Sequence, residues 1–156
     1  MAYRTILLKS GREGEPLPKE DKAIAAITPG HLIERNASGV QKHSTGGGSA
    51  SPRFAIEDSL QGQEISDAYT TGARVQSVMA DRGDEVYAWL AQGESVVPGD
   101  KLESNGDGTL RKYVAQSASS AESETFVPDS IVAESMETLD LSTSADSATR
   151  FAVEIV

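Results

Sequence analysis

The sequence predicts an all-β protein, a small β-barrel or β-sandwich built from about eight or more short strands. Short apolar or alternating runs recur at roughly 8–12-residue intervals, which is typical of such folds. Turn-forming Gly, Pro, Asn and Asp residues separate these runs. Aromatic residues make up only 5% of the chain, so Val, Ile, Leu and Ala must supply most of the core. With 156 residues the chain is long enough for one domain with a substantial core.

Residues 1–22 are expected to form an extended N-terminal arm. Residues 3–10 (YRTILLKS) form a short strand-like apolar run, and a polar segment follows it. Pro16 and Pro18 lie in that segment, where each removes a backbone donor and resists regular structure. The arm either frays or pairs with a neighbouring chain, and both alternatives remain open here.

Residues 23–156 are expected to form a single domain. The pattern predicts strands at 23–27, 31–36, 40–43, 53–59, 74–80, 85–91, 100–104, 109–115, 130–141 and 149–156. One helical turn is expected at 64–69, and the Ser/Ala/Glu-rich segment 115–124 is expected to be a flexible loop. The expected core residues are Ile24, Ile27, Leu32, Ile33, Phe54, Ile56, Val75, Val78, Val86, Ala88 and Leu90.

The charge and composition exclude several function classes. A net charge of −10 repels phosphate backbones, and no basic patch opposes it, so no nucleic-acid partner is expected. The chain has no cysteine, which excludes disulfides, thiol catalysis and cysteine-based zinc sites. No signal peptide or membrane-spanning apolar run is recognised, so no membrane association is expected.

The segment 101–113 (KLESNGDGTLRKY) has the rhythm of a calcium-binding loop. If Glu103 takes the first position, Asn105, Asp107 and Gly108 follow at the third, fifth and sixth. The twelfth position then falls on Val114, where such a loop needs a bidentate carboxylate. A Gly-rich β-turn between two strands is therefore the prediction, with a weak calcium site of another type as the alternative.

No catalytic, cofactor-binding or metal-binding residue is predicted. His31 and His43 are the only histidines, and neither belongs to a metal-ligand or nucleophile motif. Tyr87 and Trp89 share one face of a predicted strand. They are expected to cover the open end of the barrel or to lie at a subunit contact, with a sugar-stacking platform as the alternative.

Four segments, in this order, carry a resemblance to a known family. They are TPGHLIERNASGVQKHSTGGG, FAIEDSLQGQEISDAYTTGARV, GDEVYAWLAQGESVVPGDKLESNGDGTLRKY and ESMETLDLSTSADSATRFAVEIV. Together they resemble the head decoration, or capsid cement, proteins of tailed bacteriophages. The resemblance spans roughly residues 23–156 and is most specific in the Tyr-x-x-Gly and Val-x-Pro-Gly-Asp-x-Leu stretches.

The resemblance implies a non-enzymatic β-barrel or β-sandwich module. Such a module is made in the host cytoplasm, binds the outer surface of the virion capsid and stabilises it, commonly as a homotrimer. The implied partners are the major capsid protein and neighbouring copies of the chain. The expected contact residues are Tyr3, Arg4, Ile6, Leu7, Leu8, Tyr87 and Trp89.

Two other functions remain open from the sequence. One is a carbohydrate-binding or host-adhesion module on the virion surface, which requires an exposed aromatic pair at Tyr87 and Trp89. The other is a hydrolase, which requires a cleft that holds His31 or His43 beside a carboxylate.

Overall fold

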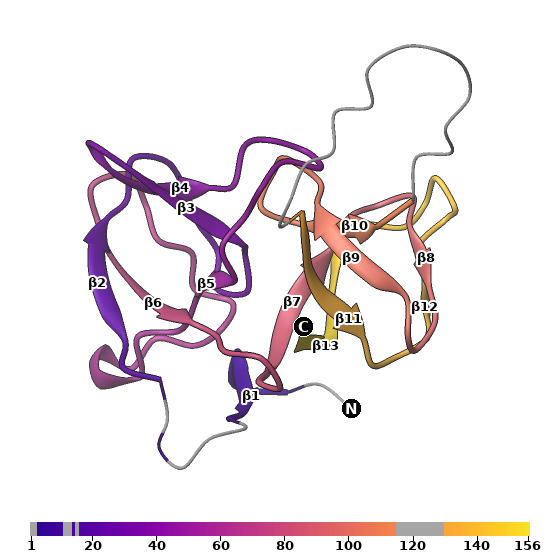
Figure 1. Ribbon diagram of the computed structural model, residues 1–156. Coiled ribbons are helices and arrows are strands. Elements are labelled where there is room, and N and C mark those ends of the chain that lie inside the picture. The colour runs from indigo at the N-terminus through magenta and orange to yellow at the C-terminus, as the bar shows by residue number, and fades with distance from the viewer. Residues whose placement is uncertain (1–2, 11–13, 15, 115–129) are drawn as a thin grey trace.

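The computed structural model describes residues 3–10, 14, 16–114 and 130–156. The predicted all-β class is confirmed, and short strands dominate the chain (Figure 1). Their bounds are β1 Leu7–Lys9, β2 Lys19–Lys22, β3 Ile33–Asn36, β4 Gly39–Lys42, β5 Arg53–Ala55, β6 Arg74–Met79, β7 Glu85–Leu90, β8 Ser95–Val96, β9 Lys101–Ser104, β10 Leu110–Lys112, β11 Ile131–Ser135, β12 Leu139–Asp140 and β13 Thr149–Ile155. The flexible loop expected at 115–124 lies outside the described residues.

Five strands form a closed barrel. Strands β7, β10, β9, β11 and β13 are hydrogen-bonded in that order, and β13 pairs again with β7 to complete the ring. The closing pair is the longest, with an unbroken antiparallel register from Thr149 opposite Leu90 to Glu154 opposite Glu85. Closure leaves these strands without the unpaired edges of an open sheet. Strand β1 adds to the N-terminal half of β7, outside the ring.

A second lobe lies beside the barrel, on the left of Figure 1. It contains the sheet β2-β6-β5 and the hairpin β3–β4. Strand β2 lies next to the hairpin, where Ala23 forms an isolated bridge with Val40. The lobe is therefore assembled from residues of the N-terminal half of the chain, including part of the segment expected as an arm.

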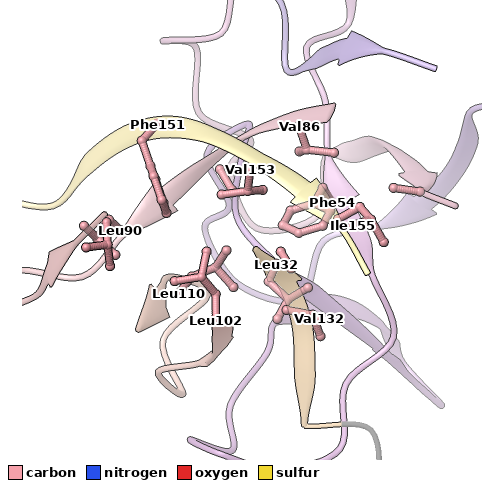
Figure 2. Packing of buried hydrophobic residues seen from close by; sticks show 14 of the residues in the cluster. Leu32, Phe54, Val86, Leu90, Leu102, Leu110, Val132, Phe151, Val153 and Ile155 are labelled. Atoms are coloured by element: carbon pink, nitrogen blue, oxygen red, sulfur yellow. The ribbon is translucent and has the colours of Figure 1, made fainter. Parts of the chain in front are cut away.

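Each lobe has its own cluster of buried apolar residues. The barrel cluster includes Val86, Leu102, Phe151 and Val153 (Figure 2), and the smaller cluster includes Ile27, Ile33, Val40 and Val75. Leu32 and Phe54 come from the second lobe but belong to the barrel cluster. Of the predicted core residues, Ile24 and Ile56 are only half-buried, and the other nine are buried.

The N-terminal segment differs from the expected arm. Strand β1 pairs with β7 and β2 pairs with β6 of the same chain. Ile6 is fully buried in the barrel cluster. Burial of the Ile6 side chain removes apolar surface from water, and pairing with β7 and β6 satisfies backbone amides of β1 and β2. Much of this segment is therefore part of the fold.

Three other expected elements have different forms. The segment 23–27 makes only isolated bridges, Ala23 with Val40 and Ile27 with Tyr69. The segment 130–141 contains two strands, β11 and β12, separated at 136–138. The expected helical turn at 64–69 is a single turn closed by Asp67 N–H on the Glu64 carbonyl, and a short 3-10 helix, η1, lies earlier at Ser59–Gln61.

Candidate functional site

The structure separates the expected contact residues into exposed and buried groups. Tyr3 and Arg4 are exposed, and Leu7 and Leu8 are half-buried. Ile6 is fully buried: its N–H donates to the Glu57 carboxylate at 3.1 Å and its carbonyl accepts the Tyr87 N–H at 2.7 Å. Ile6 is therefore a core residue, whose side chain leaves no exposed surface for the partner contact that the sequence suggested.

Strand β1 is an edge strand at the side of the barrel. In the part of the chain that the structure describes, it pairs with β7 alone. The Tyr3 ring packs edge-on against Tyr87, with ring centroids 5.1 Å apart. A partly exposed aromatic pair beside a strand with an open edge is a surface on which another chain can dock or add a strand.

Trp89 is held in a polar seam between the lobes. Its indole Nε1 donates to the Pro29 carbonyl at 2.9 Å, and the Arg150 guanidinium lies 4.2 Å from its ring centroid. Arg150 Nε donates to the same Pro29 carbonyl at 3.1 Å, and another of its nitrogens donates to the Ile65 carbonyl. These hydrogen bonds hold the loops around Pro29 and Ile65 against the outer face of β7 and β13.

These contacts bear on the sugar-stacking alternative. The Trp89 ring already contacts Arg150, and the His31 ring lies 5.7 Å away at a 30° tilt. Trp89 and Tyr87 are both half-buried. The pair therefore belongs mainly to the protein's own packing, and we do not propose sugar binding.

Arg150 is the member of this seam that sequence reasoning missed. It lies directly opposite Trp89 in the β13–β7 register. Opposed side chains on paired strands are within contact distance. The signal that identifies Arg150 is therefore the strand register, which a single sequence does not display.

His31 is held neutral in the same seam. Its Nδ1 accepts the Thr28 N–H at 3.0 Å, which requires an unprotonated nitrogen. Burial first, and then the positive charge of Lys42, lower the pKa of His31 to about 4. The Asp107 carboxylate acts in the opposite direction, and Arg150 adds a smaller lowering. The imidazole is thus uncharged in the folded protein at neutral pH.

This depressed pKa predicts a pH dependence of stability. Between pH 6.5 and about 4 the unfolded chain binds a proton at His31 that the folded chain excludes, so stability falls as the pH is lowered. From pH 7 to pH 5 we expect a loss of about 1–1.5 kcal/mol, allowing for the solvent contact of the ring. Urea unfolding of the wild type and His31→Gln at both pH values measures it. Equal losses in the two proteins contradict the prediction.

His43 lies in a cleft beside a carboxylate, as the hydrolase alternative requires. Its Nε2 is 3.1 Å from the Ser49 carbonyl and 3.8 Å from Glu34 Oε2, and its Nδ1 is 2.8 Å from Ser104 Oγ. The carbonyl can only accept, so Nε2 carries the proton and Nδ1 accepts from Ser104. Ser104 Oγ in turn accepts the Gly106 N–H. Ser104 is completely buried, so its hydroxyl is not open to a substrate in this arrangement.

The segment 101–113 forms the predicted hairpin. Strands β9 and β10 pair antiparallel with Leu110 opposite Ser104, and Gly106 and Gly108 both have positive φ. The Asp107 carboxylate accepts from the Thr109 N–H at 3.0 Å and from its hydroxyl at 2.5 Å. Burial opposes the Asp107 charge, but these hydrogen bonds outweigh it and lower its pKa. The acidic side chain of the turn is thus a local cap on the backbone.

The described residues contain neither a metal-ligand cluster nor a membrane-spanning helix. No group of three His, Asp or Glu side chains among residues 3–10, 14, 16–114 and 130–156 is arranged to hold a metal ion. The same residues contain no helix with the length and apolar character needed to cross a membrane.

The sequence matches no protein-family model and no curated protein. The candidate site is therefore defined by its own geometry: the open edge of β1 with Tyr3, Tyr87 and the half-buried Leu8.

Proposed function

We propose that this chain is a structural protein of a tailed-bacteriophage virion that binds the outer surface of the capsid lattice and stabilises it. The observation that carries the proposal is the ordered resemblance of four segments over residues 23–156 to head decoration proteins. The β-barrel is compatible with that family's architecture. The partners we propose are the major capsid protein and neighbouring copies of the chain, as a homotrimer.

The β1 surface supports a binding role. An edge strand offers unpaired backbone groups that a neighbouring chain can extend, and Tyr3 adds an aromatic side chain of the type enriched at interfaces. Many copies bind one lattice together, so the binding free energy of each copy needs to be only a few kcal/mol. This favours a small contact patch over a deep binding groove.

Co-sedimentation with purified, DNA-free phage heads tests the proposal. We expect the wild-type chain to pellet saturably with the heads and to raise their resistance to heat or chelator, and light scattering to give a trimer mass. Point variants suit the contact better than deletion of residues 1–22, because Ile6 and two strands belong to the fold. Absence of binding by the wild type overturns the function.

Tyr3→Ala and Leu8→Asp test the contact surface separately. Tyr3 is exposed and Leu8 is half-buried. The control is Leu60→Ser, because Leu60 of η1 is 97% exposed. We expect the first two variants to lose at least tenfold in affinity for heads and the control to bind normally. If all three bind like the wild type, the contact lies elsewhere on the surface.

A further inference from the structure

A cavity of about 270 Å³ lies in the second lobe, between the β3–β4 hairpin and the β5–β6 pair. Residues from β3, β5, the end of β6 and the segment after β4 surround it. Its polar lining consists of Glu34, Arg35, His43, Ser49, Ser51 and Arg53. Ile33 and Met79 complete the wall with apolar surface.

Arg53 is the unusual member of this lining. It is only 9% exposed, yet its one side-chain hydrogen bond among the described residues is from Nη1 to Ser77 Oγ at 3.4 Å. It forms no ion pair with a carboxylate of the described chain, and burial followed by the charge of Arg35 lowers its pKa. A buried guanidinium is ordinarily paired, because desolvating an unpaired charge is costly.

Arg53 lines the cavity, and its remaining nitrogens are not sealed inside the described protein. Within the described residues, no buried side-chain nitrogen or oxygen lacks a hydrogen-bond partner. The Arg53 nitrogens that make no hydrogen bond must therefore retain solvent contact, and the cavity that Arg53 lines provides it. These N–H groups form the planar fork that matches a carboxylate.

The other charged groups in the wall are already engaged. Arg35 pairs with Asp21 at 2.7 Å. The Glu34 carboxylate accepts from Gln41 at 2.6 Å and from the Ser44 hydroxyl at 2.7 Å. Burial works against the Glu34 charge, but these hydrogen bonds outweigh it and lower its pKa, so Glu34 stays ionised at neutral pH. Its negative charge disfavours ligands that carry two negative charges.

We propose that this cavity binds a monovalent carboxylate group, with Arg53 as the charged donor. The hydroxyls of the exposed Ser49 and Ser51 offer further donors, and Ile33 and Met79 offer apolar surface for the carbon that bears the carboxylate. The volume admits a small organic acid or an acidic side chain. This inference goes beyond the capsid role and stands without it.

Amide chemical shifts during titration with sodium acetate test the proposal, with sodium chloride at equal ionic strength as the reference. We expect saturable shifts at His43, Ser49 and Ser51 with a Kd of about 10 mM or below, as one Arg–carboxylate contact provides. Sodium sulfate is expected to bind more weakly than acetate. N-acetyl-aspartate amide distinguishes the sources: tighter binding than acetate assigns the pocket to a protein side chain, and weaker binding assigns it to a free acid.

Variants separate the pocket from general charge effects. Arg53→Met is expected to raise the acetate Kd at least tenfold, whereas Arg74→Gln, at an exposed arginine of β6 that pairs with Glu20, leaves it unchanged. If Arg53→Met does not fold, Glu34→Gln gives a second test. Because this variant removes a negative charge from the cavity wall, sulfate binding is expected to strengthen several-fold relative to acetate binding. Shifts that do not saturate, or a Kd that is unchanged in Arg53→Met and a selectivity unchanged in Glu34→Gln, overturn the proposal.

Discussion

Replacement of Phe54 by alanine is expected to lower the free energy of unfolding by about 3–5 kcal/mol. Phe54 is completely buried on β5, where it pairs with Val78 of β6 and bridges to Leu32. Its ring nevertheless belongs to the barrel cluster, which also contains Ile155 (Figure 2). Truncation removes apolar contacts from both lobes and leaves a cavity between them, which well-packed strands cannot close.

Urea unfolding monitored by Trp89 fluorescence and by circular dichroism measures this effect. The control is Leu60→Ala, because Leu60 is 97% exposed and its truncation is expected to change stability by less than about 0.5 kcal/mol. We expect the wild type to unfold in one transition, since both lobes contribute residues to the cluster that holds Phe54. A loss below about 1.5 kcal/mol, or a lobe that unfolds separately in the wild type, contradicts the assigned role.

The strand β7 illustrates what the sequence predicts well. Its alternation places Val86, Ala88 and Leu90 inside and Tyr87 and Trp89 outside, and the burial in the structure follows that pattern. A single local period is sufficient because one face of the strand meets the core. The Gly-rich turn of the β9–β10 hairpin is predicted equally well, since its chemistry is confined to adjacent residues.

The N-terminal segment and β13 illustrate what the sequence does not predict. Lys19–Lys22 has no apolar pattern and becomes a strand only because β6 supplies its hydrogen-bond partners. In β13, Phe151, Ala152 and Val153 are all buried, which breaks the alternation expected of a barrel strand. Long-range pairing decides both cases, and the same pairing brings Arg150 to Trp89 and Arg53 to its cavity.

Replacement of Gly39 by alanine is expected to lower the free energy of unfolding by about 3 kcal/mol or more. Gly39 begins β4 with a φ of +146°, a conformation that L side chains rarely adopt. A Cβ atom at this position lies 2.1 Å from the Lys22 carbonyl oxygen and 3.1 Å from Ile24 Cγ2. The obstacle is backbone, so relief requires the end of β2 to move away from the β3–β4 hairpin.

Gly72→Ala separates the two contributions to that loss. Gly72 has a φ of +89°, but a Cβ there meets no atom within 4 Å, so its replacement carries only the conformational cost of about 1 kcal/mol. The difference between the two variants in urea unfolding then measures the cost of placing a side chain at position 39 against the Lys22 carbonyl. Gly39 belongs to the β3–β4 hairpin, whose other strand supplies Glu34 and Arg35 to the cavity. Gly39→Ala is therefore expected to weaken acetate binding while Gly72→Ala preserves it, and equal stability losses in the two variants would show that β2 does not press against the hairpin as the structure has it.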